Sequence, residues 1–168
     1  MLMANGEITD DLDEHLEAYG RMFMVTRRRD GSPTCHPMAR FYADREMYIN
    51  MYAASAKHRN LTRDHRITCL ITTNSDDAEF RAVVLQGTAR HMTPDETLAS
   101  ERPGARLART IGMEGVKKVE DAPEKFQTEE PTDWLKRAAV MLERIRDGVR
   151  VLWHVEPQQA GFLDQVRR

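Results

Sequence analysis

The sequence predicts a mainly β chain with flanking helices (α+β), in which about six antiparallel strands form a barrel and helices pack outside it. Strand-like apolar segments fill the first half of the chain, and short turns join them, which favours antiparallel neighbours. Helical patterns gather in the second half. No glycine-rich nucleotide loop and no nucleophile elbow is present, so nothing indicates a dinucleotide, P-loop or serine-hydrolase site.

Composition and charge narrow the class of protein. The chain has 168 residues, of which 40% are hydrophobic and 31% charged, which is typical of one folded domain. We divide it into an N-terminal helix (1–20), a barrel core (21–92), a helical elaboration (93–147) and a closing strand with its tail (148–168). The net charge of -2 argues against nucleic acid or anionic lipid as a partner. No stretch can span a membrane and no signal-peptide core is found, so we expect a cytoplasmic protein.

The first half of the chain contains one helix before the strands and one among them. The first helix begins at Thr9 or Asp10, has an acidic first turn and ends at Gly20. A short helix is expected from Ser55 to Asp64. Five strands are expected at Met22–Arg28, Thr34–Tyr42, Glu46–Tyr52, Arg66–Thr73 and Glu79–Met92, with Gly87 marking a bulge or a close approach in the last.

The second half predicts helices and one closing strand. Thr93, Pro94 and Glu96 occupy the N-cap, N1 and N3 positions of a capping box. A further helix is expected around 105–111, and another runs from its cap at Thr132 to Gly148. The last strand alternates from Val149 to Glu156, and Pro157 is expected to end it.

Cysteines and histidines show no metal spacing. Cys35 and Cys69 lie in apolar strand segments, so we expect two buried, reduced thiols. His36, His91 and His154 lie in three different strands, so we predict no metal site. No acid–base pair stands out, so we name no catalytic residue.

The segment Ser55–Leu61 (SAKHRNL) departs from a helix rule. With Ser55 as the N-cap, Lys57, His58 and Arg59 fall in the first turn, where the helix dipole disfavours cations. A bound anion would remove this conflict, because free amides, a hydroxyl and the cations together make a phosphate site. The alternative is a basic helix that only faces solvent.

These segments, taken in order, resemble the pyridoxamine 5′-phosphate oxidase-like split-barrel family, which includes flavin and deazaflavin oxidoreductases. The resemblance covers Arg21 to about His91 and a C-terminal segment. It rests on Phe23–Thr26 with the turn Asp30–Pro33, Thr34–Met38, Met47–Met51, the SxKxxNL-like segment Ser55–Leu61, Arg81–Gly87 and Val149–Phe162. It implies a six-stranded antiparallel split β-barrel of the FMN-binding type, and a homodimer with the cofactor at its interface.

The resemblance also implies the cofactor-binding residues. Ser55, Lys57 and Arg59 would hold the cofactor phosphate, with Asn60 in the same segment. Asn50 and Met51 would lie along the isoalloxazine or ribityl chain through their backbone. Arg40 falls near a phosphate-binding arginine of the oxidases, and His36 and Pro37 line the second strand.

The implied function is an oxidoreductase that uses FMN, or alternatively the deazaflavin coenzyme F-420, to transfer hydride to or from a small organic substrate. The arginines of the true pyridoxamine phosphate oxidases are absent from Trp153–Gln159, so that particular reaction is not expected. The alternative is a non-catalytic protein that binds flavin or a tetrapyrrole such as haem, with His36, His91 and His154 as candidate axial ligands.

Overall fold

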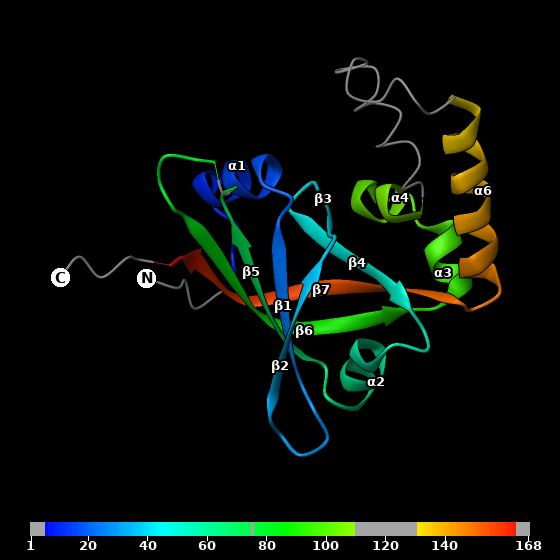
Figure 1. Ribbon diagram of the computed structural model, residues 1–168, viewed down its shortest axis with the longest axis horizontal. Helices are drawn as coiled ribbons and strands as arrows, with labels where there is room; N and C mark the ends of the chain where they lie inside the picture. Colours follow the sequence, from blue (N-terminus) through cyan, green and yellow to red (C-terminus); the bar gives the residue numbers. More distant parts are fainter. Residues whose placement is uncertain (1–5, 75, 110–130, 164–168) are drawn as a thin grey trace.

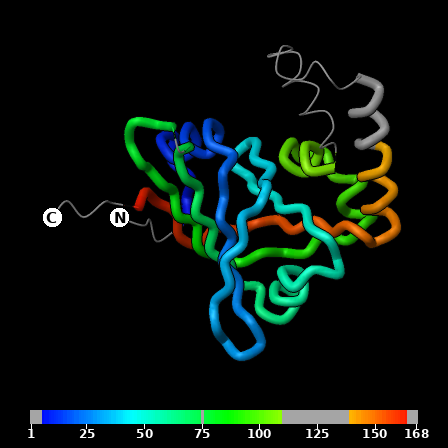
Figure 2. Tube along the Cα trace, viewed as in Figure 1, coloured from blue at the N-terminus to red at the C-terminus, as the bar shows by residue number. Residues whose placement is uncertain are grey.

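The computed structural model describes residues 6–74, 76–109 and 131–163, and gives the backbone alone for 131–138 (Figure 1). Its elements in chain order are α1 (Asp10–Ala18), β1 (Met22–Arg27), β2 (Pro33–Met38), β3 (Phe41–Ala43), β4 (Glu46–Tyr52), α2 (Ala56–Arg63), β5 (Arg66–Thr72), β6 (Ala82–Met92), α3 (Pro94–Ala99), α4 (Pro103–Arg109), α6 (Pro131–Arg146) and β7 (Arg150–Phe162). Helices α3, α4 and α6 gather at one end of the sheet, away from α1 (Figure 2). No helix in these ranges is both long and apolar enough to cross a membrane.

The strands form one antiparallel sheet in the order β2-β1-β5-β6-β7-β4-β3. The outermost strands, β2 and β3, are joined by Ala39 and Arg40 alone. Two residues bridge only about 11 Å, so the two edges of the sheet must meet there, and the sheet is rolled into a split barrel. The predicted barrel and its flanking helices are therefore confirmed.

The described residues form seven strands, so the predicted number of six was wrong. The expected strand Thr34–Tyr42 is divided in two, because β2 pairs with β1 whereas β3 pairs with β4 at the other edge. The chain must therefore turn between Met38 and Phe41. A single sequence pattern cannot reveal that its two halves pair with different strands.

The closing strand is also longer than expected. β7 continues through Pro157 to Phe162, and the β6–β7 register shifts between Gln86 and Gly87. A proline is tolerated at such a bulge, where regular ladder bonding is interrupted. The prediction of a bulge or a close approach at Gly87 is confirmed, because the register shifts there and a Cβ on Gly87 would lie 2.1 Å from the Glu156 carbonyl oxygen.

Two apolar clusters bury β4 on both faces. Met47, Ile49 and Met51 point into the barrel interior. The alternate residue Tyr48 points outward, into a second cluster with α4. A Cβ on Gly104 would lie 2.6 Å from the Tyr48 ring, so a glycine allows α4 to approach this strand closely.

The opposite part of the sheet has an open outer face. On β2, Pro33, Cys35 and Pro37 are exposed, because no described element covers this side of the strand. The expectation of two buried thiols therefore holds for Cys69 and was wrong for Cys35. Burial raises the pKa of the Cys69 thiol to about 12.

Candidate functional site

The start of α2 has backbone amides that no described group satisfies. Ser55 is the N-cap, and its Oγ accepts a hydrogen bond from the His58 amide at 3.2 Å. The Ser55 carbonyl accepts from the Arg59 amide at 3.2 Å. Within the described ranges, no acceptor is found for the amides of Ala56 and Lys57. A helix start of this kind can hold an anion.

Cations surround these amides. The first turn of α2 contains no acidic residue. Lys57 is half-buried and forms no ion pair with any described residue. The pKa of His36 on β2 is lowered, first by the burial of His36 and second by the nearby charge of Lys57. Arg28 contributes to the same shift. The Arg59 guanidinium donates to the Ala54 carbonyl at 2.7 Å and is otherwise exposed. The structure thus places Ser55, Lys57 and Arg59 at one helix start and brings the charge of Lys57 near His36.

Asn60 holds α2 against β1. Its side chain is only 8% exposed, its Nδ2 donates to Thr26 Oγ1 at 3.1 Å, and its oxygen accepts from Arg63 at 3.2 Å. Arg63 also donates to the Arg27 carbonyl at 2.6 Å. The geometry therefore gives Asn60 a positioning role, with both ends of its amide engaged inside the chain.

A second anchor of α2 has no counterpart in the sequence analysis. Trp153 Nε1 on β7 donates to His58 Nδ1 at 3.3 Å, and the His91 ring lies 5.5 Å from the His58 ring. Burial lowers the pKa of His58, which favours the neutral form that can accept this bond. No sequence spacing links these three residues, because the sheet topology alone brings β6, β7 and α2 together.

Asn50 and Met51 lie on opposite faces of β4. Asn50 Nδ2 donates to the Ala108 carbonyl at 3.2 Å under α4, whereas Met51 is buried in the barrel core. β3 pairs with residues 46–48 only, so residues 49–52 have no described strand partner on that side. Their backbone, and not their side chains, is therefore what they can offer a ligand there.

The β2 residues and Arg40 are spread along the sheet. His36 shares the inner face with Met24, whereas Pro37 faces outward. The Arg40 guanidinium donates to the carbonyls of Leu16 and Tyr19 at the end of α1. Arg40 lies near the first residue of β1, whereas α2 lies near the last residue of β1. These two ends of the strand are about 17 Å apart. The structure does not bring Arg40 to the start of α2.

A pocket of ≈540 Å³ lies on the open outer face of the sheet. Arg27, Arg66 and the amide side chains Gln86, Gln158 and Gln159 are among its lining residues. None of the nine predicted cofactor residues lines it. We therefore base the candidate site on the start of α2, where free amides and cations coincide.

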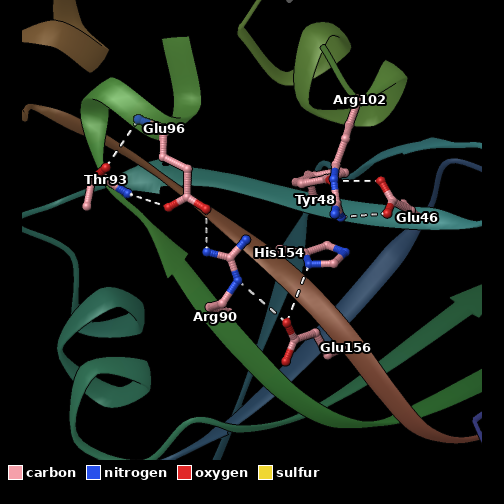
Figure 3. Close-up of polar contacts among 8 residues, drawn as sticks. All are labelled: Glu46, Tyr48, Arg90, Thr93, Glu96, Arg102, His154 and Glu156. Carbon is pink, nitrogen blue, oxygen red and sulfur yellow. Dashed lines mark hydrogen bonds and ion pairs between the residues drawn. The ribbon is translucent and has the colours of Figure 1, made fainter. Parts of the chain in front are cut away.

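The candidate haem ligands are not brought together. His154 stacks on the Tyr48 ring at 4.8 Å and approaches Glu156 at 3.6 Å, as Figure 3 shows. His91 packs on Trp153, and His36 lies on β2. Among the described residues, no group of histidine, cysteine, aspartate or glutamate side chains could hold a metal ion.

Solved structures with the same fold support the architecture. A conserved hypothetical protein of Mycobacterium tuberculosis is 18% identical, with a TM-score of 0.62 over 96% of this chain and 88% of that one. HutZ, the haem storage protein of Vibrio cholerae, is 10% identical, with a TM-score of 0.58 over 94% of both chains. A structure named F420 reductase is 17% identical, with a TM-score of 0.53 over 91% of this chain and 96% of that one. At these identities the similarity establishes the fold alone.

The family is established by sequence. A search among curated proteins returns no match. The family model described as pyridoxamine 5′-phosphate oxidase matches residues 8–162, which includes the entire described barrel and α2. The chain therefore belongs to the pyridoxamine 5′-phosphate oxidase family.

Proposed function

We propose that this protein binds a phosphate-bearing flavin cofactor, FMN or the deazaflavin F-420, and acts as an oxidoreductase on a small organic substrate. The observation that carries the proposal is the start of α2, where two amides without a described acceptor, a hydroxyl cap and the cations Lys57 and Arg59 converge. A phosphate there would satisfy the amides and neutralise the cations at once. The bound cofactor would supply hydride transfer at its central ring.

Each residue has a defined part in this proposal. The amides of Ala56 and Lys57 and the Lys57 ammonium bind phosphate oxygens, with Arg59 beside them. Ser55 fixes the helix start, and Asn60 fixes the helix on β1. The backbone edge of 49–51 that faces away from β7 and the inner face of β2, with His36, border the rest of the cofactor. We leave Arg40 out of the phosphate site, because α1 carbonyls occupy its guanidinium.

A second copy of the chain would cover the open outer face of the sheet. The outer face of β1, β2 and β5 is uncovered by any described element, and a pocket of ≈540 Å³ opens on it. An open sheet face of this kind is typical of an association surface. We propose a homodimer in which the partner covers this face, while the cofactor at the dimer interface and a cytoplasmic location stay predictions.

The reaction is proposed to differ from oxidation of a vitamin B6 phosphate. The stretch from Trp153 to Gln159 contains no arginine. In the structure it lies in β7, where Trp153 contacts His58 of α2 and His91 of β6, and His154 stacks on Tyr48 of β4. The substrate is therefore proposed to be another small organic molecule that can exchange hydride with the cofactor.

One observation favours a second candidate, a haem-binding protein without turnover. A pocket of ≈450 Å³ is lined by His65 and His91, with Arg90 at its side. Imidazoles can ligate haem iron. The absorption spectrum described next tests whether this pocket holds haem.

The test is an absorption spectrum of the purified protein, followed by mass spectrometry of what heat releases. Bound or added FMN, or deazaflavin, supports the proposal. A Soret band supports the haem candidate. A colourless protein that binds none of these three would contradict both.

A further inference from the structure

Two arginines from different elements converge on Tyr52, next to the start of α2. The Arg150 guanidinium lies 3.6 Å above the Tyr52 ring, and Arg144 on α6 donates to the Tyr52 hydroxyl at 3.5 Å. Tyr52 is 46% exposed, so this cluster is open to a ligand. We name these three residues, Tyr52, Arg144 and Arg150, the arginine–tyrosine cluster.

The two guanidinium groups have no carboxylate partner in the described part of the chain. Arg150 makes one long hydrogen bond, to Asn50 at 3.5 Å, and its buried Nε has no acceptor. By contrast, Arg45, Arg66, Arg90, Arg102, Arg106 and Arg109 all form ion pairs with acidic side chains. A buried guanidinium N–H without an acceptor is unfavourable, and an anionic oxygen would relieve it.

Backbone bonds fix this cluster beside the phosphate site. The Tyr52 carbonyl accepts from the Ser55 amide at 3.0 Å, a turn that keeps their Cα atoms within about 7 Å. Val149 links the other elements, since its amide donates to the Arg144 carbonyl at 2.8 Å and its carbonyl accepts from the Ala53 amide at 3.0 Å. One ligand with two anionic groups could therefore contact both places.

We propose that the arginine–tyrosine cluster binds carboxylates on a tail that extends beyond the cofactor phosphate. Planar guanidinium groups match carboxylate geometry, and the tyrosine hydroxyl adds a donor. This inference rests on the proposed function and sharpens it, because FMN ends at its phosphate whereas F-420 continues into a glutamyl tail. The cluster thus selects the deazaflavin over FMN.

The first test compares the two cofactors in titrations of matched variants. Arg144→Ala should weaken binding of F-420 about tenfold, the value of one charge-assisted bond, and leave FMN binding within about twofold of wild type. The control is Arg146→Ala, which removes the same charge from the same helical turn but on another side of α6, and should change neither. Equal effects of Arg144→Ala on both cofactors, or no effect on F-420, would overturn the inference.

A second test separates this inference from the proposed function. The dipeptide γ-glutamyl-glutamate is titrated into ¹⁵N-labelled protein, and the Arg150 Nε–H signal is identified by its loss in Arg150→Lys. We expect a saturable shift of that signal, and competition of the dipeptide with F-420. If wild type binds neither cofactor, the proposed function fails, yet this shift still supports a carboxylate site.

The dipeptide also distinguishes the source of the carboxylate. No shift, or an equal shift with inorganic phosphate, would overturn the carboxylate site. If the dipeptide binds without lowering the affinity for F-420, the cluster binds a separate ligand, and the inference that it binds the F-420 tail is wrong. Arg144→Ala replaces an exposed side chain, so its folding is checked by an unchanged Tm.

Discussion

Helices α2 and α3 begin with the same cap and differ in what surrounds it. In α2 the Ser55 hydroxyl accepts from the third helical amide at 3.2 Å, and in α3 the Thr93 hydroxyl does the same at 3.2 Å. In α3 the third residue is Glu96, which reaches back to the Thr93 amide and binds Arg90 at 2.6 Å (Figure 3). In α2 the third residue is His58, whose ring bonds to Trp153 instead.

The start of α3 is stabilised by its own acidic side chains, whereas the start of α2 has none. Asp95 and Glu96 place negative charge at the start of α3, as the helix dipole favours. α2 has no acid in its first turn, and Lys57 is held there without a partner among the described residues. The open start of α2 is the feature that a bound phosphate would complete.

The strongest test of this comparison removes the two cations of α2. Lys57→Ala with Arg59→Ala should weaken FMN binding about 100-fold, if each cation contributes about 1.5 kcal/mol through a charge-assisted bond. Stability should change little, because neither cation has a carboxylate partner among the described residues. Calorimetric titration and thermal melts measure both quantities. Wild-type affinity in the double variant would mean that α2 does not hold the phosphate.

The next effect concerns the anchor of α2 on the barrel. Asn60→Ala should lower the free energy of unfolding by about 2 kcal/mol, because it leaves Thr26 without its buried partner. Urea unfolding measures the loss. Thr26→Val is the matched partner variant, and the double variant should cost less than the sum of the two single ones. Strict additivity would show that the bond contributes nothing.

Acid should destabilise the protein through its histidines. Burial is the largest cause that lowers the pKa of His15, His36, His58, His91 and His154. Between these lowered values and the usual 6.5, the unfolded chain binds more protons, so stability falls as pH decreases through that window. Melting curves from pH 8 to pH 5 should show a Tm that falls once the pH drops below about 6.5. His58→Gln should reduce the slope, and a flat profile would contradict these assignments.

The smallest effects compare the two caps directly. Ser55→Ala and Thr93→Ala should each cost about 1 kcal/mol, since each removes one N-cap hydrogen bond. Only Ser55→Ala should also weaken FMN binding, because α3 has no part in the proposed site. Denaturation and cofactor titration of the two variants give the answer. Equal cofactor affinity in both would place the phosphate away from α2.

Much of the site's local chemistry could be predicted from the sequence. Ser55 as a cap followed by Lys57 and Arg59 is a short-range pattern, and a dipole conflict can be recognised without any tertiary contact. The capping box at Thr93 was predicted for the same reason and is confirmed. The role of Arg40 could not be predicted, because its partners on α1 lie more than twenty residues away.

The sequence by itself determined the antiparallel barrel with flanking helices, because alternating apolar residues and turn residues act over a few positions. Tertiary structure decided which strands pair, and so divided the segment Thr34–Tyr42 into β2 and β3 at opposite edges. It also decided which charges meet. Arg144 and Arg150 lie about a hundred residues from Tyr52, and only the pairing of β4 with β7 and the docking of α6 bring them to one ring.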